Sequence, residues 1–175
     1  MTQIQSRFLI LLPYLAITML PALVAAQTSL GTGDEKILPG AMCQPSDQTA
    51  KYRREPSGIM YNFDDFAQEW VCPILRDNEH ARSSALKAAI EVVIQNEEDE
   101  VSCTLCSFSW VGGVVLCVDN RNTTKPLTEI HELVWKNNPN IPSKSSGYYF
   151  IQCTIPGPSS RTRFTSGVIA YRWAE

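Results

Sequence analysis

Short apolar runs separated by clusters of turn-forming residues recur through the chain from Cys43 to the last residue. They return at intervals of about ten to fifteen residues, a rhythm typical of antiparallel β-sandwiches and barrels. We therefore expect an all-β protein whose residues 43–175 form a single, jelly-roll-like antiparallel β-sandwich. The expected strands are 57–62, 68–75, 85–95, 100–109, 113–119, 129–135, 147–155 and 167–173.

Segment 85–95 is compatible with two structures. Its apolar residues alternate with the residues between them, which fits a strand. Leu86, Ile90 and Val93 would also line one face of a helix, and alanine favours helix. The β-branched residues and the strand-rich neighbourhood favour a strand, with helix as the alternative. A single helical turn is also compatible with Asp64–Gln68.

Residues 1–26 have the pattern of a secretory signal peptide. Arg7 supplies a weakly positive start, residues 8–26 are almost wholly apolar, and Val24-Ala25-Ala26 provides the small residues that a signal peptidase recognises. A membrane anchor is the alternative, because about 19 apolar residues nearly span a bilayer. Two prolines inside the segment argue against an anchor. We expect cleavage after Ala26 and a secreted or periplasmic protein.

The mature chain of about 149 residues suits one domain. Residues 27–42 contain glycine and proline without periodicity, so we expect a flexible leader there. The net charge of −3 becomes about −4 on cleavage, and the absence of a basic tract excludes nucleic acid as an expected partner. No second apolar segment approaches bilayer length, so we expect no membrane association after cleavage.

All six cysteines follow the expected cleavage point, and an even number in an exported chain predicts disulfides. Cys103 and Cys106 also have the spacing of zinc and redox motifs. A zinc site would need further ligands nearby, and the chain has only two histidines. A thioredoxin-like site would need a helix at Cys103, where we expect a strand. We predict three structural disulfides that lock the two sheets, and no cofactor; zinc binding and redox activity remain alternatives.

The hairpin 100–119 predicts one of the pairs. Glycines at 112 and 113 accept the backbone conformations that tight hairpin turns need. A loop of Val111-Gly112 places residue 110 opposite residue 113 and therefore Cys106 opposite Cys117, at a separation that a disulfide can span.

The remaining pairs follow from strand geometry and elimination. Cys103 lies three residues from Cys106 and so points to the opposite face of the strand. We assign it to Cys153, which leaves Cys43 to pair with Cys72.

The cysteine-bearing segments also follow a broader pattern. It comprises Cys-Pro-Ile-Leu-Arg-Asp-Asn at 72–78, Val-Ser-Cys-Thr-Leu at 101–105, Gly-Tyr-Tyr-Phe-Ile-Gln-Cys-Thr-Ile-Pro at 147–156, and Ser-Gly-Val-Ile-Ala-Tyr at 166–171. Over about residues 41–175 the chain resembles a group of small, uncharacterised exported β-sandwich proteins of proteobacteria. The resemblance implies the sandwich and the Cys43–Cys72 and Cys103–Cys153 pairs, and it carries over no catalytic residue. Cys106 and Cys117 look like additions to the pattern.

Two groups of residues are weak candidates for ligand binding. Asp77 and Asn78, followed by Glu79, could give oxygen ligands to calcium, although such residues more often cap their own backbone in a loop. Trp110 and Tyr148 could stack on a sugar if they are exposed. Trp70 and Trp173 lie within strands, where burial is expected. Tyr148 and Tyr149 must point to opposite faces, so one sheet face can bury only one of them.

No catalytic constellation emerges from the sequence. A serine-type triad needs an oriented base, and of the two histidines, His80 and His131, the latter is expected to face solvent. Carboxylates that might cleave glycosides are present at Asp64, Asp65, Glu69, Asp99 and Glu132, but sequence does not fix their separation. We therefore expect a non-enzymatic exported module with a binding, adhesion or surface-structural role. The alternatives are a secreted hydrolase using carboxylates or a metal, and a secreted carbohydrate-binding protein; the partner would be a glycan or another protein.

Overall fold

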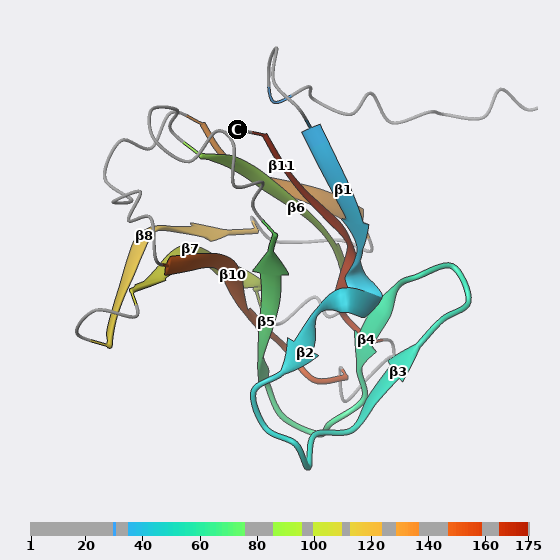
Figure 1. Ribbon diagram of the computed structural model, residues 1–175. Coiled ribbons are helices and arrows are strands. Elements are labelled where there is room, and N and C mark those ends of the chain that lie inside the picture. Colours follow the sequence, from blue (N-terminus) through green and yellow to red (C-terminus); the bar gives the residue numbers. More distant parts are fainter. Residues whose placement is uncertain are drawn as a thin grey trace, which may run out of the picture.

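The computed structural model describes residues 30, 35–75, 86–95, 100–109, 113–123, 129–136, 147–158 and 165–174. These residues form eleven strands and one 3-10 turn (Figure 1). The elements are β1 (Glu35–Pro39), η1 (Gly40–Met42), β2 (Gln44–Pro45), β3 (Tyr52–Arg54), β4 (Met60–Asn62), β5 (Gln68–Ile74), β6 (Lys87–Ile94), β7 (Ser102–Ser109), β8 (Val114–Asn122), β9 (Glu129–Trp135), β10 (Gly147–Ile155) and β11 (Gly167–Ala174). In this part of the chain, no helix has the length and apolar character needed to cross a membrane.

The strands form two antiparallel sheets that face each other. The six-stranded sheet has the order β3-β4-β11-β6-β9, and β1 also pairs with β11; the five-stranded sheet has the order β2-β5-β10-β7-β8. From β4 to β11 the chain passes back and forth between the sheets, and only the hairpin β7–β8 keeps two successive strands in one sheet. This connectivity is that of a jelly roll. The predicted all-β, jelly-roll-like sandwich is confirmed.

Most predicted strands lie where the sequence places them. Strands β9 and β10 coincide with the predicted bounds, and residues 87–94 form a strand, not a helix. Strand β6 is buried on both faces, because Ile90 contributes to the main core while Ala89 packs with Leu30 and Ala174 on the other side. Because both faces of the strand are buried, both carry apolar residues, and these also fit the apolar face of a helix.

Two local predictions are wrong. Of the strand expected at 57–62, only residues 60–62 pair with other strands. A turn precedes them, in which Gly58 has a φ of 89° and the Gly58 N–H donates to Glu55 O. The helical turn considered at Asp64–Gln68 is absent; residues 64–66 bend before β5 begins.

The flexible leader predicted over 27–42 is wrong for its second half. Residues 35–39 form β1, which pairs along β11 from Glu35 opposite Ala174 to Pro39 opposite Ala170, and residues 40–42 form η1. The strand escapes prediction because it is short and its partner lies at the other end of the chain. Residues 1–26 and the expected cleavage point lie outside the described residues.

The structure contains three disulfides, between the pairs expected: Cys43–Cys72, Cys103–Cys153 and Cys106–Cys117. Two of them join paired strands of the five-stranded sheet, and the third joins β5 to Cys43, the residue directly before β2. Cys103 lies directly opposite Cys153, and Cys106 directly opposite Cys117. The predicted bracing by three disulfides is confirmed, and all three bonds lie within one sheet: they join the residue before β2 to β5, β10 to β7, and β7 to β8.

The two sheets are held together by buried side chains. Trp70 from the five-stranded sheet packs with Trp135 and Trp173 from the six-stranded sheet in one core, and all three are fully buried, as expected for Trp70 and Trp173. Each such aromatic buries roughly 150–250 Å², on the order of 4–6 kcal/mol at about 25 cal/mol per Å². Hydrogen bonds also link the two sheets: the Tyr171 hydroxyl donates to Pro73 O at 2.9 Å, and the buried Asn62 amide donates to Ile155 O at 2.9 Å.

An ion-paired arginine joins three strands on the outer face of the six-stranded sheet. Arg172 on β11 is only 5% exposed, and its guanidinium donates to Glu35 on β1 at 3.0 Å and to Glu132 on β9. Because charges this far from water need compensation, the two carboxylates allow an arginine to occupy a nearly buried position.

Removing the disulfides one at a time, by replacing both cysteines with alanine, is expected to lower the free energy of unfolding in the order of the loops they close. The sequence separations are 50, 29 and 11 residues for Cys103–Cys153, Cys43–Cys72 and Cys106–Cys117. The loop-entropy model gives losses of about 4.1, 3.6 and 2.8 kcal/mol respectively. Urea denaturation of the three double variants measures the order; the largest loss from the Cys106–Cys117 pair would contradict it.

Tyr171→Phe is expected to cost about 1 kcal/mol of stability at neutral pH, because it removes the hydrogen bond to Pro73. Burial raises the pKa of the Tyr171 hydroxyl above its ordinary value of 10.0. A raised pKa in the folded state means that the stabilisation is complete below pH ~10 and is lost as the pH rises above it. The stability difference between wild type and variant should therefore shrink between neutral pH and about pH 11 in urea titrations; an unchanged difference would show that Tyr171 does not titrate in this way.

Candidate functional site

The outer face of the five-stranded sheet carries the candidate residue Tyr148. Alternation along β10 places Tyr149 and Ile151 in the core and sends Tyr148, Phe150 and Gln152 outward. Tyr149 is 3% exposed and Tyr148 46% exposed. The prediction that these two tyrosines serve opposite faces is confirmed.

Three aromatic rings lie side by side on this face, and we call Phe108, Tyr148 and Phe150 the aromatic row. Phe108 on β7 is the direct partner of Tyr148 across the ladder, with ring centroids 5.1 Å apart and planes inclined by 33°. The Tyr148 and Phe150 rings are 5.8 Å apart and inclined by 40°. Because Phe108 is half-buried and Phe150 buried, Tyr148 is the ring that a ligand would meet, supported on both sides.

Apolar groups extend the aromatic row toward the edge strand β8. Val115, which is 49% exposed, lies opposite Phe108. The Cys106–Cys117 disulfide lies in the next rung, where Cys106 is opposite Phe150. The result is a continuous apolar surface across β10, β7 and β8.

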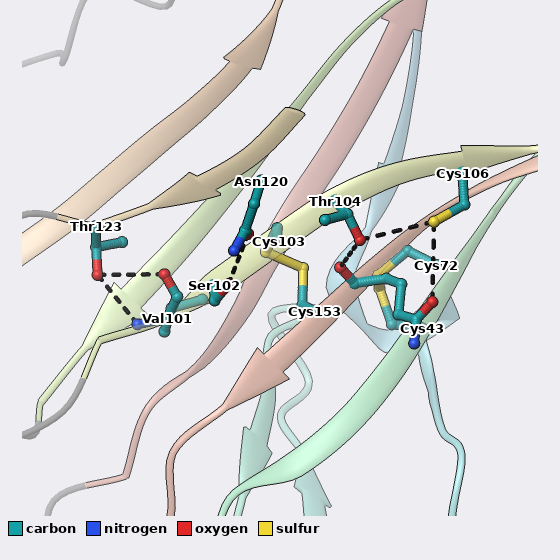
Figure 2. Close-up of a disulfide and its surroundings, with 11 residues drawn as sticks. Cys43, Cys72, Val101, Ser102, Cys103, Thr104, Cys106, Asn120, Thr123 and Cys153 are labelled. Atoms are coloured by element: carbon teal, nitrogen blue, oxygen red, sulfur yellow. Dashed lines mark hydrogen bonds between the residues drawn. A yellow bond between two sulfur atoms is a disulfide. The ribbon is translucent and has the colours of Figure 1, made fainter. Parts of the chain in front are cut away.

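A polar strip borders this surface farther along the same strands. Figure 2 shows Thr104 beside Cys106; since the oxidised sulfur carries no proton, the Thr104 hydroxyl is the donor in their 3.6 Å contact. The Thr104 hydroxyl also lies 3.5 Å from Gln152 O, and the Gln152 amide donates to Glu69 on β5. The outer face thus combines an apolar surface with hydrogen-bonding groups.

Hydrogen bonds fix the end of the β7–β8 hairpin that lies away from its turn. This end begins beyond the register shift between Cys103 and Leu105. The Thr123 hydroxyl accepts from Val101 N at 3.1 Å, and the Ser102 hydroxyl donates to Asn120 Oδ1 at 2.7 Å (Figure 2). With the disulfide in the same hairpin, these bonds hold β8 in place beside β7.

Five of the other candidate residues cannot be compared with the predictions. Trp110, Asp77, Asn78, His80 and Asp99 lie outside the described residues.

His131 does not face solvent as expected. It lies opposite core residue Val92 and on the same side of β9 as Leu133, so it is half-buried at the sandwich edge. Within the described part of the chain, the buried Nε2 of His131 has no hydrogen-bond partner.

Two of the candidate carboxylates, Asp64 and Glu132, have structural partners. Asp64 is buried and accepts from Lys51 N at 3.2 Å and from the Gln68 amide at 3.1 Å, while Glu132 binds Arg172. No group of three or more histidine, cysteine or acidic side chains among the described residues could hold a metal ion. These residues thus support the fold.

A hollow that the sequence did not predict lies between β2 and β3. It has a volume of about 260 Å³ and is lined by Gln44, Pro45, Gln48, Tyr52 and Arg54. The sequence predicts no strand before residue 57, so only the observed fold brings these side chains together. We call this hollow the β2–β3 cleft.

No protein-family model and no curated protein matches the chain. Among solved structures, it is similar to a family 11 carbohydrate-binding module from Clostridium thermocellum, solved in complex with a β-1,3-1,4-mixed-linked tetrasaccharide, with a TM-score of 0.36 and 11% sequence identity over 83% of this chain and 88% of that one. A likeness this distant carries no argument about the ligand, so any function has to be argued from the residues described above.

Proposed function

We propose that this protein is a non-enzymatic binding module that holds a glycan on the outer face of its five-stranded sheet. The observation that supports the proposal is Tyr148, a 46% exposed ring held between two further aromatic side chains. A tyrosine presents an apolar face with a polar tip, which matches a sugar ring with its C–H face and rim of hydroxyls.

The geometry favours an oligosaccharide over a single sugar. The rings of the aromatic row are inclined to one another by 33° and 40°, so one flat sugar ring can stack on Tyr148 but not on all three. Gln152 follows Tyr148 by four residues on β10, or about 14 Å along the strand. A ligand lying along β10 would stack at one end and form hydrogen bonds at the other.

The platform is built to be rigid. Its strands β7, β8 and β10 are joined by two of the three disulfides, and a surface ordered before binding loses less conformational entropy when a ligand arrives. Disulfides also persist in oxidising compartments, which supports a module that works after export.

Tyr148→Ala is expected to weaken glycan binding roughly five- to thirtyfold, the effect of losing about 1–2 kcal/mol of stacking and apolar contact. A glycan array on the mature protein identifies the ligand, and calorimetry measures the change in Kd. Tyr148→Phe should retain most of the affinity because it keeps the ring.

Phe66→Ala is the matched control, since Phe66 is 62% exposed and lies outside the aromatic row. An array on which the wild-type protein binds no glycan, or a Tyr148→Ala variant that binds like the control, would refute the proposed site.

Strand β8 supports a second candidate function, assembly through strand addition. It spans Val114–Asn122 and is the outermost strand of its sheet among the described residues, and both Val115 and Leu116 are over 40% exposed. Long edges of this kind can pair with another chain.

If β8 pairs with another copy of the protein, light scattering should show a concentration-dependent oligomer that Leu116→Lys abolishes. A monomer at all concentrations would contradict strand addition and leave glycan binding as the single proposed function.

A further inference from the structure

The β2–β3 cleft lies where one edge of each sheet comes together. Strand β2 is the edge of the five-stranded sheet and β3 the edge of the six-stranded sheet. Figure 1 shows the two strands in the same part of the molecule, connected by the loop of residues 46–51. The cleft of about 260 Å³ is open to solvent and lined mostly by polar side chains.

Arg54 gives the cleft its charge. Its guanidinium lies over the ring of Tyr52, 5.5 Å from the ring centroid. Stacking occupies one face of the planar guanidinium and leaves N–H groups at its edge for a ligand. The neighbouring Arg53 is paired with Glu55 at 2.8 Å, whereas the described part of the chain offers Arg54 no carboxylate partner.

Both acidic residues that adjoin the cleft lining in sequence, Glu55 and Asp47, are already engaged, and Glu55 pairs with Arg53. Asp47 precedes Gln48, but its carboxylate accepts from Thr49 N and from the Thr49 hydroxyl, both at 2.8 Å. The hydrogen bond from the Thr49 backbone, and to a lesser extent the one from the Thr49 hydroxyl, lowers the pKa of Asp47. The Asp47 carboxylate therefore remains an acceptor for groups within its own turn.

The loop that completes the cleft is fixed before any ligand binds. Ser46 N donates to Glu69 O at 2.7 Å, the Asp47–Thr49 turn follows, and Lys51 N donates to the buried Asp64 at 3.2 Å. On the other side, the Cys43–Cys72 disulfide holds the residue directly before β2. The polar groups of Gln44 and Gln48 are therefore carried by ordered backbone.

Gln44, which lines the cleft, projects from the same face of the five-stranded sheet as the aromatic row. Gln44 lies opposite Val71, which lies opposite Gln152, and directly opposite residues project from the same side of a sheet. Tyr148 is two strands and four residues away from Gln44 in the ladder, or roughly 17 Å from strand spacing and rise. One oligosaccharide can span that distance.

We propose that the β2–β3 cleft is a subsite for the carboxylate of an acidic sugar, a hexuronate unit within the glycan that stacks on Tyr148. The inference rests on the proposed glycan-binding function. A planar guanidinium donates two parallel hydrogen bonds to a carboxylate, and the amides of Gln44 and Gln48 can donate to and accept from hydroxyls on the same sugar ring. Pro45 adds an apolar surface to the cleft.

The test compares uronate-containing oligosaccharides with their carboxyl-reduced forms, which keep every linkage and exchange only the carboxylate for a hydroxymethyl group. Array screening selects a pair of probes, and calorimetry at low and high salt gives Kd. The acidic form should bind about ten- to hundredfold more tightly, as expected for a charge-assisted hydrogen-bonded pair, and the difference should diminish at high salt.

Three variants assign the effect to the cleft. Arg54→Gln should abolish the preference for the acidic probe without changing the affinity for the reduced one, and Arg54→Lys should restore only part of it because lysine lacks the planar fork. Arg53→Gln is the matched control, since it removes the adjacent arginine on the same strand and should retain the preference. Circular dichroism and urea titration establish that each variant is folded.

The outcomes separate this inference from the proposed function. Equal affinity for acidic and reduced probes, or an equal loss from Arg53→Gln and Arg54→Gln, would overturn the carboxylate subsite while Tyr148-dependent binding stands. An acidic preference that requires Arg54 but is unaffected by Tyr148→Ala would support the subsite and remove the aromatic row from the site. If neither form of any probe binds, both proposals fall.

Discussion

Cohesion between the two sheets depends on buried side chains from β5, β9 and β11, because no disulfide in the described structure crosses from one sheet to the other. Three fully buried tryptophans fill the interior, and the Tyr171 hydroxyl satisfies a backbone carbonyl of the opposite sheet. The disulfides do not contribute to this packing directly, because they join neighbouring segments within one sheet. The protein thus combines a covalently braced layer with a second layer that adheres to it by apolar contact.

The braced layer is also the one that carries the proposed glycan site. Cross-strand bonds hold β2 against β5 and β7 against both of its neighbours, so the positions of Tyr148 and Gln44 on the outer face are set by covalent as well as hydrogen-bonded contacts. The cleft needs the other layer too, since Tyr52 and Arg54 belong to β3. A ligand that touches both regions would contact the edge at which the two layers meet.

The parts of the fold that sequence could predict are those encoded locally. Strand β10 shows clear alternation, and the hairpin of β7 and β8 carries both its turn glycine and a cysteine pair in matching register, so its pairing followed from a few adjacent residues. Strands β1, β2 and β3 were not predicted because they are only two to five residues long, and β1 and β2 pair with strands that lie far from them in sequence. His131 was misplaced for a related reason: the pattern Ile-His-Glu-Leu-Val does not reveal which face meets the core until Leu133 and Trp135 are seen to define it.

Strand β11 pairs with β6 along one edge and with β4 and then β1 along the other, so it is the centre of the six-stranded sheet although it comes from the far end of the described sequence. Strand β1, and the hairpin of β3 and β4, therefore cannot join this sheet until nearly all of the described chain is available. Contacts between such distant segments make folding slow and leave strand edges exposed in the meantime. A chain arranged in this way is poorly suited to fold in stages while it is being synthesised. The six-stranded sheet is completed late, when β11 is inserted between strands that were synthesised long before it.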